Sequence, residues 1–245
     1  MSSSTPVLIL GAHSDIGQAL GRAYARQGRP LLLAARAPER LEADATDLRL
    51  RYSVEVRVLA FDVLDLASHR PFLDGLTAFP GTVVSVIGFM GSQADSEQDP
   101  AAAHVVMDSN YTAPALFLGE AANRLLGTGG CIVGISSVAG DRGRATNYVY
   151  GSAKAGFTAF LSGLRNRLSK TNVQVITVKP GFVDTRMTEG MKLPPLLTAQ
   201  PEEVAAAIVT AEAKRRDVIY VRPIWRVIMA IICLIPERVF KGLKL

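Results

Sequence analysis

A tyrosine and a lysine lie four residues apart in the sequence, at Tyr150 and Lys154. On a helix, this spacing places the phenol and the ammonium on one face. A free phenol titrates at a pH of about 10, and a neighbouring cation lowers its pKa. We therefore predict that Tyr150 exchanges a proton with a carbonyl oxygen, and that Lys154 stays charged and keeps the phenol acidic.

Hydroxyl and amide side chains precede this pair. Ser137 lies thirteen residues before Tyr150, where its hydroxyl can donate a hydrogen bond to a developing oxyanion. The spacing fits the neighbouring Ser136 less well. Asn110 either holds a water that relays protons from Lys154 to solvent or is a buried amide that bonds the backbone. The candidate catalytic residues are therefore Asn110, Ser137, Tyr150 and Lys154.

A turn that contains glycines follows the first apolar segment, Val7–Leu10. Gly11 would let the backbone turn tightly, and Gly17 would let the helix pack closely on the strand. The N–H groups at the start of such a helix can bind a pyrophosphate. The candidate cofactor-binding residues in this turn are Gly11, His13, Ser14, Ile16 and Gly17.

Two charged residues bear on the kind of cofactor. Asp15 stands where a middle glycine would let phosphate approach, so we expect loose or displaced pyrophosphate binding unless its carboxylate points away. With Gln18, it also has the spacing of a helix cap. Arg36 follows the second apolar run. Its guanidinium matches the 2′-phosphate of NADP in charge and shape, and the alternative is that Arg36 is a solvated residue at a strand end. His13 is either a second contact to that phosphate or a surface residue, and we expect NADPH in preference to NADH.

These residues require elements that hold them at one edge of a sheet. Short apolar runs, typical of strands buried on both faces, occur at Val7–Leu10, Leu31–Ala35, Val54–Phe61, Val83–Ile87, Cys131–Ser136, Val173–Val178 and Val218–Val221. Helices are predicted between them at Asp15–Gln27, Glu39–Arg51, Pro100–Leu126, Tyr150–Ser169 and Pro201–Arg215. This alternation predicts a single-domain, Rossmann-type α/β fold, with a doubly wound parallel sheet and helices on both faces.

Composition excludes several classes of protein. The 245 residues are 49% hydrophobic and carry a net charge of +5, which is not typical of a disordered or a nucleic-acid-binding chain. Cys131 and Cys233 lie far apart, so we expect neither a disulfide scaffold nor a metal site. We find no signal peptide and no apolar run of membrane-spanning length, so we expect a cytoplasmic protein.

Residues 222–245 form an apolar and basic tail after the catalytic domain, which we assign to residues 1–221. An apolar block that contains Trp225 is flanked by arginines and lysines, and Pro236 should end or kink its helix. Such a segment can lie at a membrane surface and attract anionic lipid. The alternative is a helix that is buried in a dimer interface or closes the substrate pocket, and we expect a homo-oligomer.

Taken together, these motifs resemble the short-chain dehydrogenase/reductase family, in family order, over residues 6–221. The resemblance implies that Tyr150 is the acid/base, that Ser137 orients a ketone or alcohol substrate, that Lys154 also binds the nicotinamide ribose, and that Asn110 completes a proton relay. It also implies cofactor contacts from Arg36, Asp62, Val63, Gly88, Lys154, Pro180, Gly181, Val183 and Thr185. Asp62 has an alternative role as a turn cap, and Gly88 is the one residue kept from the family's Asn-Asn-Ala-Gly motif.

The sequence also resembles, more narrowly, the reductase subunits of decaprenylphosphoryl-ribose 2′-epimerase systems. The shared features include an acidic residue in the glycine turn, the stretch Asn147–Lys154 and an apolar-basic tail. This resemblance implies a polyprenyl-phosphate-linked 2-keto sugar as substrate and a flavin oxidase as partner. The alternatives are a reductase of another carbonyl, such as a 3-oxoacyl thioester or a steroid-like ketone, and a dinucleotide-binding module without turnover.

Overall fold

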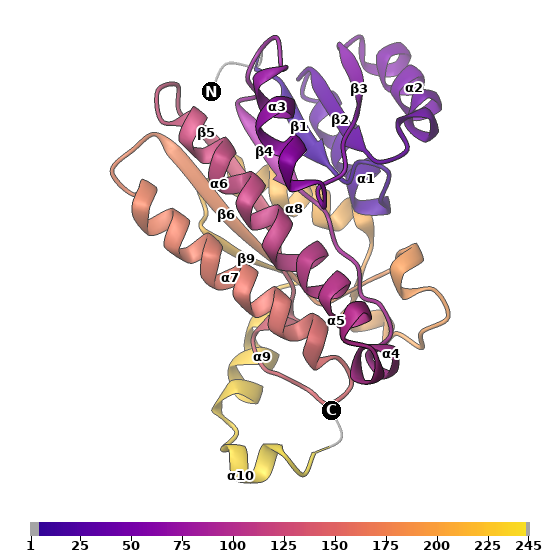
Figure 1. The fold of residues 1–245 in the computed structure, drawn as a ribbon, viewed down its shortest axis with the longest axis vertical. Helices are drawn as coiled ribbons and strands as arrows, with labels where there is room; N and C mark the ends of the chain where they lie inside the picture. Colours follow the sequence, from indigo (N-terminus) through magenta and orange to yellow (C-terminus); the bar gives the residue numbers. More distant parts are fainter. Residues whose placement is uncertain (1–4, 244–245) are drawn as a thin grey trace.

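The computed structural model of the chain describes residues 5–243. Its centre is a seven-stranded parallel sheet with the strand order β3-β2-β1-β4-β5-β6-β9 (Figure 1). The strands are β1 (Val7–Leu10), β2 (Leu31–Ala35), β3 (Val56–Ala60), β4 (Thr82–Ser85), β5 (Gly130–Ile135), β6 (Val173–Pro180) and β9 (Val218–Val221). Two short strands, β7 (Phe182–Val183) and β8 (Thr198–Ala199), pair beside it.

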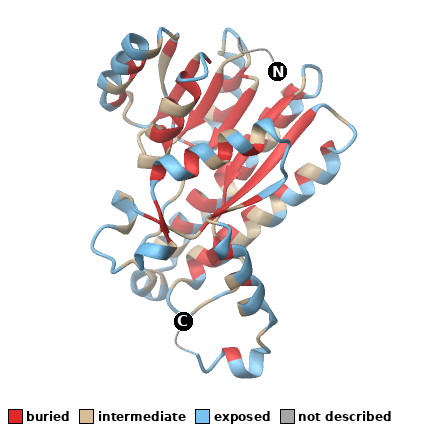
Figure 2. Cartoon of the chain, turned by 180° about the vertical axis from the view of Figure 1, so that it is seen from behind, coloured by how far each residue is buried: buried red, intermediate tan, exposed pale blue. Residues whose placement is uncertain are grey.

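Helices cover both faces of the sheet because successive side chains of each strand point to opposite faces. Val7 and Ile9 pack with α1 (Asp15–Ala25), α2 (Glu42–Tyr52) and α8 (Pro201–Ala213). Leu8 and Leu10 pack with α3 (His69–Asp74), α6 (Ala113–Leu125) and α7 (Tyr148–Leu168). Seen from behind, the strands form a buried layer between helices whose outer faces are exposed (Figure 2). The predicted doubly wound fold is confirmed.

The strand order reverses beside β1, which pairs with β2 on one side and with β4 on the other. Helices therefore leave the sheet in opposite directions from this point, and a crevice opens at the carboxyl ends of the strands. Gly11 follows β1 and Gly88 follows β4, so the sheet brings the two segments to one edge. The candidate cofactor turn and the candidate catalytic residues lie along the same edge.

The helix predicted over residues 100–126 is divided into two parts. After α5 (Pro100–Met107), a wider π turn runs over Asp108–Thr112 before α6 begins. Pro114 has no N–H to donate to the carbonyl of Asn110, four residues earlier, and its ring would collide with that carbonyl in a regular helix. The wider turn is consistent with this conflict, and it places Asn110 at the irregularity.

Other boundaries differ modestly from the prediction. A 3-10 turn at Pro38–Leu41 replaces the first residues of the predicted helix at Glu39–Arg51, and Pro38 stands in its first turn, where the fixed φ and the missing N–H of a proline are tolerated. The short helices α3 and α4 (Gln93–Gln98) were not predicted, since six residues are too few to show a periodicity.

The tail forms two helices, α9 (Ile224–Leu234) and α10 (Glu237–Phe240), which project from one end of the molecule (Figure 1). As predicted, Pro236 separates them. No helix in the described part of the chain is long and apolar enough to span a bilayer.

Candidate active site

Tyr150 and Lys154 lie on the same side of α7, as their spacing predicted. The ammonium nitrogen of Lys154 is 5.7 Å from the centre of the Tyr150 ring, and it donates a hydrogen bond of 3.0 Å to the carbonyl oxygen of Ile135 at the end of β5. Lys154 is buried, whereas Tyr150 is half-buried. Strand β5 therefore fixes the lysine, and the phenol lies beside it at the edge of the sheet.

The structure separates the two serines that follow β5. The hydroxyl of Ser136 donates to the carbonyl oxygen of Lys154 at 3.0 Å and lies 2.7 Å from the hydroxyl of Thr158, so it holds β5 against α7. The hydroxyl of Ser137 instead interacts with Tyr150, and accepts a hydrogen bond of 3.1 Å from the N–H of Ala139. Ser137 is therefore the serine that faces the phenol, as its spacing predicted.

Burial changes both pKa values in directions that the sequence did not predict. It raises the pKa of Tyr150 from 10.0 to about 12, while the hydrogen bond with Ser137 acts in the lowering direction. Burial also lowers the pKa of Lys154 from 10.5 to about 7, so the amine is about half-protonated near neutral pH. Burial therefore acts against both expectations, an acidified phenol and a permanently charged lysine, because it disfavours the charged form of each group.

The lowered pKa of Lys154 has a consequence for stability. Below about pH 7 both the folded and the unfolded chain hold this proton, and the cost of burying the charge is fully present. Above it the unfolded chain binds more protons, so the contribution of Lys154 to the free energy of unfolding should rise by up to about 1.4 kcal/mol per pH unit until the unfolded pKa of 10.5. Urea unfolding at several pH values should show this rise, and Lys154→Met should remove it.

The exposed Lys170, near the end of the same helix, provides the control for this measurement. Lys170→Met should retain the dependence of the unfolding free energy on pH, because this variant leaves the buried Lys154 in place. Parallel curves for the native chain and for Lys154→Met would contradict the assignment.

Asn110 is fully buried, and its side chain bonds the backbone. Its oxygen accepts from the N–H of Phe89 at 3.2 Å, and its nitrogen donates to the carbonyl oxygens of Phe89 and Val106 at 2.5 and 2.8 Å. A Cβ atom at Gly88 would lie 3.3 Å from the Asn110 oxygen and 3.6 Å from the Lys154 nitrogen. The amide therefore holds the segment after β4 beside Lys154, as the second interpretation of Asn110 predicted, and its part in a proton relay stays a prediction.

The glycine turn has the backbone conformation that its sequence predicted. Gly11 has a φ of +77°, and a Cβ atom at Gly17 would lie 2.7 Å from the carbonyl oxygen of Gly11. The N-cap of α1 is Ser14, whose hydroxyl accepts from the N–H of Gly17 at 3.1 Å. The capping role considered for Asp15 is therefore wrong. Ser14 has the extended backbone that an N-cap requires, whereas Asp15 is already the first residue of the helix.

Asp15 points toward a residue on a different loop. Its two carboxylate oxygens accept hydrogen bonds from the backbone N–H and the side-chain Nε of Arg186, at 2.8 and 3.0 Å. Arg186 also donates through Nη2 to the carbonyl oxygen of His13. We call this group, Asp15 with Arg186 and the His13 carbonyl, the clasp. It neutralises the carboxylate and joins the turn after β1 to the segment after β7.

Arg36 is exposed at the end of β2, and no hydrogen bond or ion pair engages its side chain among residues 5–243. His13 has a buried Nδ1 atom with no partner in that range. Asp62 accepts from the N–H of Leu64 at 3.0 Å, as in its alternative role in a turn, while Val63 is buried. Among residues 5–243, Arg36 is therefore an unpaired cation at the end of β2, and His13 holds an unpartnered buried nitrogen in the glycine turn.

The segment after β6 is enclosed by the tail. Pro180 ends β6, and a side chain at Gly181 would collide with the indole of Trp225 from α9. Trp225 also contacts the Phe182 ring at 5.4 Å. Val183 is buried in β7, and the N–H of Thr185 donates to the hydroxyl of Thr188 at 3.2 Å.

The sequence did not indicate that two further residues, Arg186 and Trp225, contact the predicted site. It indicated Trp225 only as part of the apolar tail. An arginine two residues after Asp184 gives no signal of its own, and its link to Asp15 spans 171 positions in the sequence. Such a partner could be found only by pairing the unexplained acid in the glycine turn with unexplained bases elsewhere.

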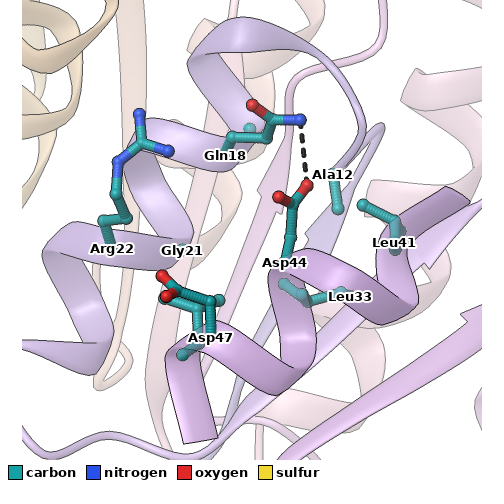
Figure 3. A pocket seen from close by; sticks show the side chains of 10 residues that line it. Ala12, Gln18, Gly21, Arg22, Leu33, Leu41, Asp44 and Asp47 are labelled. Atoms are coloured by element: carbon teal, nitrogen blue, oxygen red, sulfur yellow. Dashed lines mark hydrogen bonds between the residues drawn. The ribbon is translucent and has the colours of Figure 1, made fainter. Parts of the chain in front are cut away.

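A hollow between α1 and α2 adjoins the glycine turn, since Ala12 and Gly17 are among the residues that line it (Figure 3). Gln18 donates to Asp44 across it at 3.0 Å, and Arg22 and Asp47 line its rim. The hollow is lined in part by carboxylates and by none of Ser137, Tyr150 and Lys154. We therefore assign it to the packing of the two helices rather than to the candidate active site.

The residues at the sheet edge fit a nicotinamide dinucleotide. The left-handed Gly11 and the close approach at Gly17 form a turn open to a pyrophosphate at the start of α1. Arg36 supplies an unpaired guanidinium at the end of β2, where an adenosine 2′-phosphate would be bound. The Lys154 nitrogen lies beside Gly88, in the segment after β4, and 5.7 Å from the centre of the Tyr150 ring, so it can serve a bound ribose and the phenol together.

Comparison with known proteins gives one consistent family. The family model described as short chain dehydrogenase matches residues 5–194. An uncharacterized oxidoreductase of Mycobacterium tuberculosis is 40% identical over 245 residues, covering 98% of this chain and 97% of its own length. An uncharacterized oxidoreductase of Streptomyces coelicolor is 37% identical over 244 residues, with 97% and 95% covered. These names specify no substrate.

Solved structures with the same fold are also similar. A short-chain dehydrogenase from Sphingobium yanoikuyae in complex with NADPH superposes with a TM-score of 0.81 and 27% identity, covering 95% of this chain and 97% of that one. The bulky-bulky ketone specific alcohol dehydrogenase from Comamonas testosteroni gives a TM-score of 0.79 and 25% identity, with 96% of both chains covered.

Proposed function

Because the chain belongs to the short-chain dehydrogenase family of NAD(P)-dependent oxidoreductases, we propose that it reduces a ketone to an alcohol with NADPH and with Tyr150 as the proton donor. One observation carries the proposal. Tyr150 faces the Ser137 hydroxyl on one side, and lies beside the buried Lys154 amine on the other, 5.7 Å from its ring centre. A module that only binds a dinucleotide needs none of these three groups.

The geometry supports a simple division of roles. When bound, NADPH supplies the hydride that the carbonyl carbon receives. Tyr150 gives its proton to the carbonyl oxygen, and Ser137 donates a hydrogen bond to the same oxygen as negative charge develops there. The raised pKa keeps Tyr150 protonated at neutral pH. The protonated form of Lys154 stabilises the phenolate that remains, and solvent then returns the proton.

The choice of NADPH over NADH depends on Arg36. An exposed guanidinium without a partner among residues 5–243 is available to form a forked pair with a phosphate. An acidic residue, which would accept from a free ribose hydroxyl, is absent from this position. The NADPH complex of the Sphingobium yanoikuyae dehydrogenase supports the same choice by similarity.

The substrate that we propose first is a 2-keto sugar linked to a polyprenyl phosphate, supplied by a flavin oxidase partner. It is supported by the sequence resemblance of the glycine turn and of Asn147–Lys154 to the epimerase reductases, and by the apolar surface of α9. Competing substrates are 3-oxoacyl thioesters and bulky, steroid-like ketones.

NADPH oxidation measured against one panel of these three classes tests the proposal. We expect the lipid-linked keto sugar to give the highest kcat/KM. A higher value for either competitor would retain the reductase and replace the substrate, whereas binding of NADPH without oxidation by any ketone would favour the binding module.

The clasp gives a further prediction. Without the Arg186 guanidinium, the Asp15 carboxylate would keep only the backbone N–H of residue 186 as a partner, and its uncompensated charge would repel the expected pyrophosphate. We expect Arg186→Met to weaken NADPH binding about tenfold, the size of one like-charge contact in a partly exposed site.

The double variant Asp15→Asn with Arg186→Met separates repulsion from lost contact. Binding of NADPH, measured by fluorescence titration, should return most of the way to that of the native chain because both charges are gone. If the double variant binds NADPH as weakly as Arg186→Met alone, Arg186 contacts the cofactor directly and the clasp explanation fails.

A further inference from the structure

The tail helix α9 has two distinct faces. Trp225 and Met229 are buried and pack with Val138 and Phe182, beside Ser137 and the segment after β6. The indole nitrogen of Trp225 also donates to the carbonyl oxygen of Leu197 at 3.0 Å. The inner face therefore fixes the helix to the walls of the candidate active site, and α9 is not a loose appendage.

The outer face of α9 carries a stripe of exposed aliphatic side chains. Ile224, Val227, Ile231 and Leu234 are 48%, 55%, 61% and 82% exposed. Their spacing of three, four and three residues places them along one side of the helix. In Figure 2 much of α9 and α10 is coloured as exposed, at the end of the molecule that projects from the sheet. We call α9 and α10, with residues up to 243, the arm.

The charges of the arm have one prevailing sign. Arg226, Arg238 and Lys241 are exposed, and within the described chain no acidic side chain pairs with any of them. The one acid of the arm, Glu237, pairs with Arg142 at 2.5 Å. An aliphatic stripe bordered by unpaired cations matches the apolar and the charged layers of an anionic membrane surface.

We propose that the arm docks on an anionic lipid bilayer, with α9 lying in the interface and its aliphatic stripe turned toward the acyl chains. A second copy of the chain is a poorer occupant, because pairing the stripe with itself would bring the cations of both arms together at the rim. The helix is not of spanning length, so the contact is peripheral.

Docking would hold the site close to the membrane. Since Trp225 packs on Gly181 and Met229 lies in the same cluster as Val138, the helix that meets the lipid also forms part of the wall near Ser137. A substrate that is anchored in the bilayer would then reach the crevice while its lipid anchor stays in the bilayer. Docking itself does not depend on the proposed reduction, whereas this consequence does.

Co-sedimentation with vesicles tests the docking. The full chain should bind vesicles of phosphatidylcholine mixed with phosphatidylglycerol about 100-fold more tightly than vesicles of phosphatidylcholine alone, since each basic residue near such a surface adds about a factor of 5. Two triple variants should each lose at least tenfold in binding to the anionic vesicles. They are Val227→Gln with Ile231→Gln and Leu234→Gln, and Arg226→Gln with Arg238→Gln and Lys241→Gln.

Leu50→Gln provides a matched control, because Leu50 is 78% exposed on α2, away from the arm. Its binding should equal that of the native chain, and thermal melting should show that all variants are folded. Equal binding by the native chain and both triple variants, or none by the native chain, would overturn the proposal. So would a native dimer that the aliphatic triple variant converts to a monomer, because the stripe would then be covered by a second copy.

Discussion

Tyr150→Phe is expected to lower the rate of ketone reduction by about 1,000-fold or more, while NADPH binds as it does to the native chain. The variant keeps the aromatic ring beside Lys154 and removes the one proton that the reaction needs at the carbonyl oxygen. General acid catalysis by a positioned side chain contributes about 100- to 10,000-fold. Turnover is followed by the loss of NADPH absorbance, and binding by fluorescence titration.

Tyr148→Phe is the matched control. Tyr148 begins the same helix but is 46% exposed, and its hydroxyl makes no contact with Ser137 or Lys154 among the described interactions. Its turnover should be unchanged. Near-native turnover in Tyr150→Phe, with Tyr148→Phe as reference, would show that the proton comes from another group and would remove the central assignment of the proposed function.

The fold was predictable from sequence because its strands are buried on both faces. A strand such as Val7–Leu10 has no polar face, so it appears as an uninterrupted apolar run between helical segments. The spacing of Tyr150 and Lys154 was equally informative, since both lie on one regular helix whose geometry fixes which residues share a face. In both cases a local rule decides the result.

The features that could not be predicted depend on distant neighbours. The pKa values of Tyr150 and Lys154 moved opposite to expectation because burial is set by the whole fold, whereas the sequence shows only that the two residues are near each other. Asp15 interrupts the glycine pattern of the turn, and only the fold brings its partner Arg186 against its carboxylate. Asn110 was ambiguous for the same reason, since its partners Phe89 and Val106 come from two segments.

The charges near the glycine turn favour binding of a phosphate. Asp15 forms an ion pair with Arg186, so its carboxylate does not compete with a phosphate for Arg36 at the end of β2. Arg36 is left without a partner in residues 5–243. A free guanidinium beside a neutralised turn is the combination that favours a cofactor with one additional phosphate.

Arg36→Asp is therefore expected to change the ratio of kcat/KM for NADPH to that for NADH by about 100-fold or more, in favour of NADH. The variant removes a charge-assisted, forked pair worth about 1.5 to 3 kcal/mol, and it places a carboxylate where it repels the 2′-phosphate and accepts from a free 2′-hydroxyl. Rates with each cofactor at a saturating ketone concentration give the ratio.

Arg26→Asp changes the net charge of the chain by the same amount and separates a local effect from a general one. Arg26 is the exposed C-cap of α1, at the opposite edge of the sheet from the glycine turn. If long-range charge alone governed the preference, both variants would shift the ratio alike, and raising the salt concentration would abolish the difference between cofactors. A shift confined to Arg36→Asp, and retained in salt, requires direct contact between the guanidinium and the phosphate. An unchanged ratio in Arg36→Asp would assign the preference to other residues of the edge, with His13 and its unpartnered Nδ1 atom as the next candidate.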